Sequence, residues 1–328
     1  MNPMQPAKTD APRTRRGSRQ RTTAHDARHT RRARAVHAFV VLATILFPAA
    51  RARAVAPADL CKGDPCIVAG SWTLPAGTHL DFGTSTSLRL KAGTTILVGA
   101  AAGVRTLELL AGSIVLEPGA RIVGSGDDAV ILLGARTGDV EVQAAGTTVA
   151  RILADSAASA TQAGSAGSIS IEASGGVNIA GLLDASASGE DAVAGAIDIV
   201  AGGAVSVTRD LAFGATGPGS WGGGLSIDAG GPVTLGGALL GSGTGQGGEV
   251  AIVGRGPVSV SRKVDLGGGA PDGAGGSLSI AGDGDVSLSQ VSASGGSGSD
   301  GSCGDGGALS IESGGSVTLN GSIQLSGG

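Results

Sequence analysis

The segment GGLSIDAGGPVTLG, residues 223–236, contains the pattern that decides the fold. An apolar alternation, Leu225-Ser-Ile227, is followed by a Gly-Gly pair and then by a second alternation, Val233-Thr-Leu235. The first alternation recurs along the chain at intervals of 28, 28, 25, 28 and 31 residues. Its copies begin at Ile169, Ile197, Leu225, Val250, Leu278 and Leu309, and in every copy the second alternation begins eight residues later.

A third alternation follows about six residues after the second, as in Leu211-Ala-Phe213, so each repeat predicts three short strands with one apolar face. Repeats of this length cannot close a core alone and must stack. We therefore predict an all-β fold, a right-handed parallel β-helix of three strands per coil with coils of roughly 28 residues. An antiparallel sandwich does not predict the constant offset, and a propeller needs a repeat of about 40 to 50 residues.

Glycine and loop length are expected to mark the corners of each coil. The segments 173–176, 201–204, 229–232 and 313–316 each contain Gly-Gly, which predicts tight corners with positive φ. A Gly- and Ser-rich loop of variable length follows the third strand, so we expect insertions at this corner only.

The pattern extends backward, less regularly, to Leu80-Asp-Phe82, which gives about nine coils over residues 80–328. Residues 55–79 are expected to cap the first coil. The chain stops at the strand around Ile323, in a coil that no following residue covers. Because an uncovered strand edge invites pairing, the sequence predicts either end-to-end self-association through this C-terminal coil or a truncated piece of a longer gene product.

Residues 1–54 differ from the rest in charge, with twelve of the 23 basic residues and two acidic ones. An apolar run from Val36 to Phe47 follows, and Ala52-Arg53-Ala54 offers small residues for cleavage. We interpret residues 1–54 as a disordered or helical basic leader with a signal peptide cleaved near Ala54. The alternative is a membrane anchor, for which the run is short, since a span needs about 20 residues.

Composition and charge exclude several classes of protein. Gly accounts for 61 of 328 residues, but 41 % of residues are hydrophobic and the mean hydropathy is +0.25, which excludes a disordered linker. Residues 55–328 contain 11 basic and 25 acidic residues, a formal charge of −14. A nucleic-acid partner is therefore not expected for this part of the chain.

Three cysteines follow the leader. Cys61 and Cys66 flank a short segment with Gly and Pro, so we predict a local disulfide, as is typical of an oxidising compartment. A metal site there would need further ligands, and His79 is the one candidate. Cys303 is left free or pairs with another chain. The segment 299–307 resembles one imperfect copy of a calcium-binding Gly-Asp repeat, so neither a metal nor a cofactor is predicted.

The register of the repeat places outward side chains in columns. Two columns are rich in hydroxyl groups: Ser170, Asp198, Ser226, Ala251, Ser279 and Ser310, and Asn178, Ser206, Thr234, Ser259, Ser287 and Thr318. Such a face can contact polysaccharide or ice, or it is simply a solvated surface. The carboxylates Glu172, Asp228 and Glu312 share a column but are separated by Val200, Val253 and Ala281, so no catalytic residue is predicted. Trp221, in a variable loop, is the candidate for a surface contact.

The repeat Gly-Gly-x-Leu-x-Ile-x-Ala-Gly-Gly-x-Val-x-Leu-x-Gly resembles Gly-rich bacterial surface solenoids, the haemagglutinin-repeat adhesins and autotransporter passenger regions. The resemblance covers residues 80–328 and implies export, a scaffold and adhesion. We expect a secreted or cell-surface structural or adhesive solenoid without catalysis, with polysaccharide or other cell-surface components as partners. The alternatives are a polysaccharide-active β-helix enzyme and a hydroxyl-faced binder of glycan or ice.

Overall fold

The computed structural model describes residues 55–99, 105–124, 129–157, 164–298 and 303–328, and these described residues belong to one compact unit. The expected leader, its cleavage site and residues 299–302 of the calcium-like segment lie outside the described residues. Within the described part, no helix is both long and apolar enough to cross a membrane.

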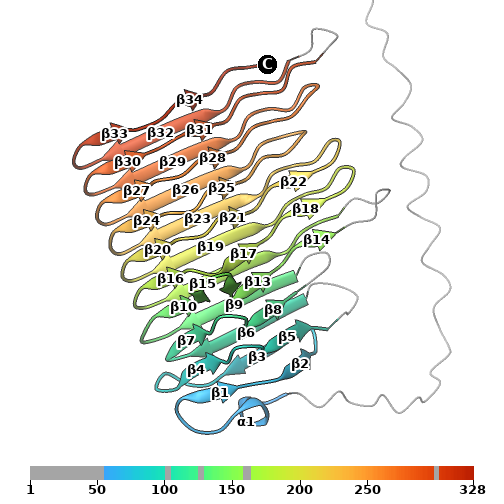
Figure 1. Ribbon diagram of the computed structural model, residues 1–328, viewed down its shortest axis with the longest axis vertical. Helices are drawn as coiled ribbons and strands as arrows, with labels where there is room; N and C mark the ends of the chain where they lie inside the picture. Colours follow the sequence, from blue (N-terminus) through green and yellow to red (C-terminus); the bar gives the residue numbers. More distant parts are fainter. Residues whose placement is uncertain (1–54, 100–104, 125–128, 158–163, 299–302) are drawn as a thin grey trace, which may run out of the picture. The chain divides into compact units, whose positions relative to one another are not determined.

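Three parallel sheets form a β-solenoid, as predicted (Figure 1). Sheet A contains β1 (Cys66–Val68), β4 (Ser87–Leu90), β7 (Ser113–Leu116), β10 (Val140–Val142), β16 (Val177–Ile179), β20 (Val205–Val207), β24 (Val233–Leu235), β27 (Val258–Val260), β30 (Val286–Leu288) and β33 (Val317–Leu319). Sheet B contains β2 (Ser71–Leu74), β5 (Thr95–Val98), β8 (Arg121–Val123), β13 (Arg151–Leu153), β17 (Leu182–Asp184), β21 (Leu211–Ala212), β25 (Leu239–Leu240), β28 (Val264–Asp265), β31 (Val291–Ser292) and β34 (Ile323–Gln324). Sheet C contains β3 (Thr78–Asp81), β6 (Arg105–Ala111), β9 (Ala129–Ala135), β15 (Ser168–Ala173), β19 (Ala196–Ala201), β23 (Gly224–Ala229), β26 (Glu249–Gly254), β29 (Ser277–Gly282) and β32 (Ala308–Ser313).

The core is a stack of like side chains, each above its equivalent in the preceding coil. Ile171 pairs in register with Ile199, and Ile199 with Ile227, and all three are at most 1 % exposed. The strands are short because each coil turns after a few residues, and alternate side chains point into the core. One continuous apolar cluster joins all coils. Each coil therefore buries its apolar side chains against those of the coils above and below it, which a single coil could not do alone.

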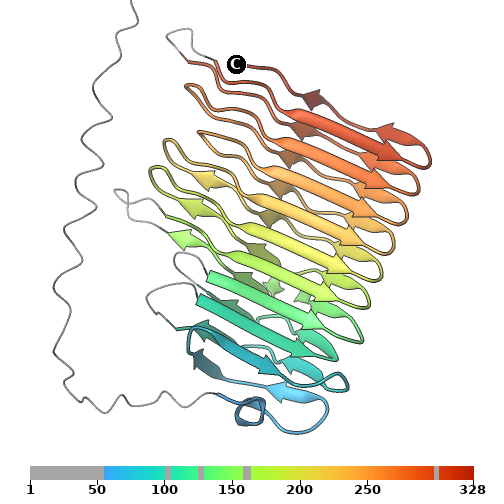
Figure 2. The same cartoon turned by 180° about the vertical axis from the view of Figure 1, so that it is seen from behind.

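The coil is right-handed. In Figure 2 the sheet C strands cross the near side toward the right as the chain climbs, and sheets A and B return behind them. The nine strands of sheet C agree with the expected nine coils, and β33 and β34 continue sheets A and B beyond the last of them.

The solenoid begins earlier than residue 80, which corrects the predicted boundary. β1, β2 and β3 already pair with the next coil, so residues 66–81 are the first coil and the cap is shorter than 55–79. The cap consists of α1 (Pro57–Leu60) and the loop closed by the disulfide. Leu60 belongs to the apolar core cluster, with Val55 and Cys61 packed against it, so this segment covers the first coil.

The predicted disulfide between Cys61 and Cys66 is present, with the two Cα atoms 5.4 Å apart, and Cys303 is a free, exposed cysteine. We expect the double substitution Cys61→Ser with Cys66→Ser to lower the free energy of unfolding by about 2 kcal/mol, since a short covalent loop restricts the unfolded chain. Urea denaturation under oxidising conditions measures the effect, and Cys303→Ser is the matched control with no change expected. An unchanged midpoint for the double variant would contradict a capping role for this loop.

The Gly-Gly corners do not use positive φ, so that prediction is wrong. None of the glycines at 175, 176, 202, 203, 230, 231, 314 and 315 has a left-handed backbone. The first glycine of the pairs at 202, 230 and 314 is needed because successive coils approach closely, whereas a Cβ at Gly176, Gly203 or Gly231 would stay at least 3.1 Å from its nearest atom. A Cβ at Gly202 would lie 2.2 Å from the carbonyl oxygen of Ser174, and one at Gly230 would lie 2.2 Å from that of Gly202.

A second set of stacked glycines, which we call the glycine column, immediately precedes the strands of sheet C. At each position a Cβ would lie between 1.6 and 2.4 Å from a carbonyl oxygen of the preceding coil. These distances are far inside van der Waals contact, so any side chain would push two coils apart. The glycine column comprises Gly167, Gly195, Gly223, Gly248, Gly276 and Gly307.

The insertions are more ordered and less confined than predicted. In the variable loops, β14 (Ser156–Ala157), β18 (Ala187–Ser188) and β22 (Ala215–Thr216) form a small parallel sheet of their own. Residues between sheets A and B also carry an insertion, an antiparallel hairpin of β11 (Ala144–Ala145) and β12 (Thr148–Val149). The connection from sheet C to sheet A also varies in the first coils, with five residues between β3 and β4 and one between β6 and β7, so loop length varies at all three corners.

Side chains of the last coil are exposed. Val317 and Leu319 on β33 are 47 % and 49 % exposed, although their equivalents in earlier coils are buried. Within the described residues, no further strand pairs with the outer edge of β33. End-to-end association through this coil remains a prediction.

Candidate functional site

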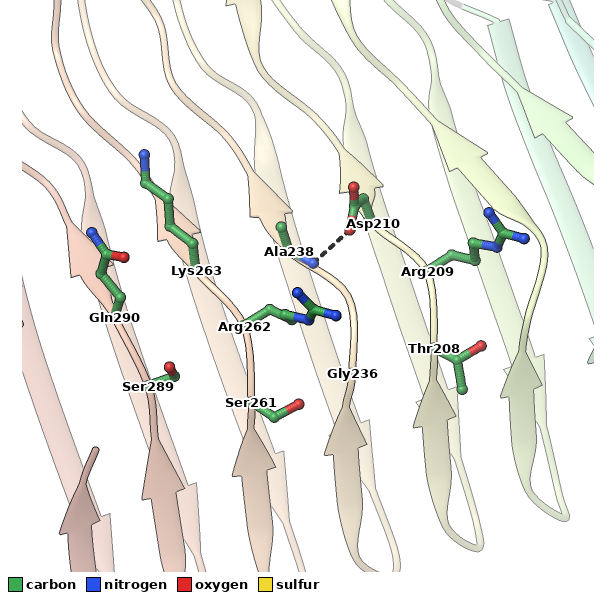
Figure 3. A pocket seen from close by; sticks show the side chains of 10 residues that line it. All are labelled: Thr208, Arg209, Asp210, Gly236, Ala238, Ser261, Arg262, Lys263, Ser289 and Gln290. Carbon is green, nitrogen blue, oxygen red and sulfur yellow. Dashed lines mark hydrogen bonds between the residues drawn. The ribbon is translucent and has the colours of Figure 1, made fainter. Parts of the chain in front are cut away.

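A hollow lies on the solenoid at the corner between sheets A and B, and we call it the basic groove. It has a volume of about 710 Å³ and crosses four successive coils (Figure 3). Residues from the turns that follow β20, β24, β27 and β30 line it: Thr208, Arg209, Asp210, Gly236, Ala238, Ser261, Arg262, Lys263, Ser289 and Gln290.

The basic groove is hollow because one coil has almost no side chains at this corner. Gly236, Gly237 and Ala238 lie between coils that carry arginine at Arg209 and Arg262. A Cβ at Gly237 would lie 1.9 Å from the carbonyl oxygen of Arg209, so close packing of the backbone requires glycine here. The longer side chains of the neighbouring coils therefore form the walls of the basic groove.

Three of the four charged side chains in the basic groove are engaged within the protein. Arg209 Nη2 donates a hydrogen bond of 3.0 Å to the carbonyl oxygen of Gly146 in the β11–β12 hairpin. Lys263 Nζ lies 2.8 Å from Asp265 Oδ2. Asp210 Oδ1 accepts a hydrogen bond of 2.8 Å from the backbone N–H of Ala238.

Arg262 is the exception. Its exposed side chain extends toward the coil of Gly236 and Ala238 (Figure 3), and among the described residues it has no hydrogen-bond or ion-pair partner. The remaining lining groups are hydroxyls and an amide, from Thr208, Ser261, Ser289 and Gln290, so the basic groove can form hydrogen bonds to a polar ligand. The repeat pattern does not indicate this site, because Arg209 and Arg262 lie two coils apart.

The structure places Trp221 at the surface, as expected, with 54 % of the residue exposed. It pairs through isolated bridges with Val193 on one side and Gln246 on the other, so it belongs to the ordered loop region. Val193 is also 44 % exposed, so Val193 and Trp221 together form a small exposed apolar patch. A contact by Trp221 remains a prediction.

The two predicted hydroxyl columns have the expected register. In sheet A, Asn178 pairs with Ser206, and the column continues to Thr318 without interruption. Ser259 Oγ and Ser287 Oγ lie 3.1 Å apart, within hydrogen-bond distance. In sheet C, Asp198 and Ala251 interrupt the other column.

The carboxylates of sheet C stay dispersed. Glu172 pairs with Val200, Val200 with Asp228, and Asp228 with Val253, so an apolar residue separates each acid from the next. His79 Nδ1 lies 2.5 Å from Glu108 Oε2 on the neighbouring strand. Among the described residues, no group of three or more His, Cys, Asp or Glu side chains is placed to hold a metal ion.

One pair of acids was not predicted from the sequence. Burial raises the pKa of Asp155, and the negative charge of Asp184 raises it further. Asp184 Oδ1 accepts hydrogen bonds from the backbone N–H and the hydroxyl of Ser186. The two acids belong to successive coils that are separated by an irregular number of residues in the sequence, so the sequence repeat did not align them.

Burial also raises the pKa of Asp198, which lies between Ser170 and Ser226 on the neighbouring strands. A carboxyl group with a higher pKa in the folded state than in the unfolded state costs stability when ionised. That cost disappears as the pH falls through the folded-state pKa. We therefore expect Asp198→Asn to stabilise the protein at neutral pH by no more than about 0.5 kcal/mol, the range of surface substitutions.

The measurement is the unfolding midpoint of Asp198→Asn relative to the wild type at neutral and at acidic pH. The gain should shrink on acidification. Asp228→Asn removes the same charge from an exposed position of sheet C and controls for the overall negative charge. A gain that is independent of pH, or that grows as the pH falls, would contradict the assigned effect of burial.

No protein-family model and no curated protein matches the chain. The class defined by the geometry is therefore the fold alone, a three-sheet parallel β-solenoid with a basic groove at one corner.

Proposed function

We propose that the protein is exported and serves in the extracellular space or at the cell surface as a non-catalytic structural or adhesive scaffold. The observation that carries the proposal is the in-register stack from β1 to β34, which sets outward side chains in straight columns with about 4.8 Å between strands. Such a surface repeats equivalent contacts along its length, which suits a polymer or a surface layer better than a small substrate.

Export is supported by the sequence of residues 1–54, whose basic and apolar segments have the order of a signal peptide. The disulfide of the cap agrees with an oxidising compartment. The test is fractionation of the native cells with N-terminal sequencing of the product. We expect a chain that begins near Val55 in the surface or extracellular fraction. A cytoplasmic product that still carries the basic leader would overturn the proposal.

The second candidate is a polysaccharide-active enzyme, which the pair of Asp155 and Asp184 favours. An acid with a raised pKa beside a second carboxyl group is the arrangement that supplies a general acid and a general base. Incubation with acidic and neutral polysaccharides, followed by an assay for new reducing ends, separates the two candidates. Product release that Asp155→Asn abolishes and Asp228→Asn does not would replace the scaffold proposal with the enzyme.

The third candidate is a hydroxyl-faced binder of glycan or ice, favoured by the uninterrupted column on sheet A from Ser206 to Thr318. Thr234→Lys places a long charged side chain in the middle of that column. Thermal hysteresis or binding to a neutral glycan that is lost in Thr234→Lys and kept in Ser226→Lys, on sheet C, would support this candidate. Absence of both activities in the wild type would exclude it.

A further inference from the structure

We propose that the basic groove is a binding site for an acidic oligosaccharide, and that Arg262 holds its carboxylate or sulfate group. The inference rests on the proposed function, because it names the class of ligand that the exported scaffold would contact. It goes further in assigning one site and one charge to that ligand.

Charge complementarity is the first support. Arg209, Arg262 and Lys263 against Asp210 give the lining residues a formal charge of +2, whereas residues 55–328 together carry −14. The basic groove is therefore a locally positive region on a protein whose net charge is negative. Asp265, which pairs with Lys263, lines a neighbouring hollow of about 410 Å³ rather than the basic groove. The excess of positive charge favours an anionic ligand over a neutral one.

The state of the individual cations is the second support. Arg209 and Lys263 have partners within the protein, and the carboxylate of Asp210 is directed to the N–H of Ala238. Arg262 alone presents an exposed, unpartnered guanidinium among the described groove residues. A guanidinium binds carboxylate or sulfate through two parallel hydrogen bonds, which gives both strength and orientation.

The length and the lining of the basic groove point to a saccharide chain rather than a single ion. Its four coils span three strand spacings, about 14 Å. Hydroxyl groups and the amide of Gln290 lie along this length, and they can exchange hydrogen bonds with sugar hydroxyls. No lining residue is aromatic, so bases of a single-stranded nucleic acid would find no aromatic stacking partner.

Titration calorimetry of the full exported chain at low salt tests the proposal with four probes of known structure. These are a hexasaccharide of galacturonic acid, a sulfated hexasaccharide, neutral maltohexaose and inorganic sulfate. We expect one or both acidic hexasaccharides to bind, with an affinity that falls as salt rises, and maltohexaose not to bind. The two acidic probes distinguish carboxylate from sulfate as the recognised group.

Arg262→Gln should weaken binding of the acidic hexasaccharide about tenfold, because it removes a charge-assisted hydrogen bond. Arg255→Gln is the matched control, since Arg255 is an exposed arginine at another corner of the same coil. Equal losses in the two variants, equal binding of maltohexaose, or sulfate alone binding as tightly as the hexasaccharide would each overturn the site. A wild-type protein that binds the acidic hexasaccharide but is found in the cytoplasm on fractionation would instead refute the proposed function and leave the binding site supported.

Discussion

Replacing Gly223 by alanine is expected to destabilise the solenoid by about 3 kcal/mol or more, among the largest effects of any conservative substitution in this chain. Gly223 belongs to the glycine column, and a Cβ there would lie 1.8 Å from the carbonyl oxygen of Gly195. The neighbouring atom is backbone of the preceding coil, so no side chain can move aside. The two coils must separate, which breaks ladder hydrogen bonds and the packing between β19 and β23.

Gly224 provides an internal control at the next residue. It begins β23, its backbone is not left-handed, and a Cβ would have nothing within 4 Å. Gly224→Ala should leave stability unchanged or raise it by about 0.4 to 1 kcal/mol, because alanine restricts the unfolded chain. Chemical denaturation of both variants gives the comparison. Similar losses for Gly223→Ala and Gly224→Ala would mean that close contact between coils is not the reason for the glycine column.

We expect Phe213 and Gly241 to be energetically coupled, so that the effect of Gly241→Ala on the free energy of unfolding changes sign when Phe213 is replaced by alanine. Phe213 is the largest fully buried side chain among the described residues, and a Cβ at Gly241, in the next coil, would lie 2.1 Å from its ring. Phe213→Ala should cost about 3 to 5 kcal/mol by leaving a cavity. Gly241→Ala alone should cost about 1 to 3 kcal/mol by overpacking. In the Phe213→Ala background, however, the same methyl group fills part of the cavity and should be stabilising.

The double-mutant cycle is measured by urea denaturation of the wild type, both single variants and the double variant. Leu183→Ala provides the control background, since it opens a cavity in an earlier coil, where Gly241→Ala should remain destabilising. Additive effects of Phe213→Ala and Gly241→Ala would contradict the stacking of a large residue against a glycine in the core.

The strands and their register were predictable because the repeat carries them directly. Ile171, Ile199 and Ile227 occupy the same position in successive repeats, and stacking of equivalent positions is the one arrangement that buries them all. The hydroxyl columns and the dispersed carboxylates follow from the same register. The disulfide of Cys61 and Cys66 was also predictable, because the two residues are close in sequence.

The role of glycine was not predictable from local patterns. A Gly-Gly pair indicates positive φ in an isolated turn, but the requirement at Gly202 and Gly230 comes from a carbonyl group one coil away. The basic groove was missed for the same reason. A signal was present, since Arg209 and Arg262 each lie two residues after the last apolar residue of their second alternation, Val207 and Val260.

Distances between spin labels on one column of sheet A test the in-register stack most directly. One label replaces Arg89 on β4, and the second replaces Ser206, Ser259 or Thr318, with Cys303 changed to Ser in every case. These pairs are four, six and eight strands apart in sheet A, which predicts about 19, 29 and 38 Å at 4.8 Å per strand. Pulsed electron paramagnetic resonance should give distances that rise linearly with the number of coils. Distances that do not increase in this order would contradict the solenoid and everything inferred from it.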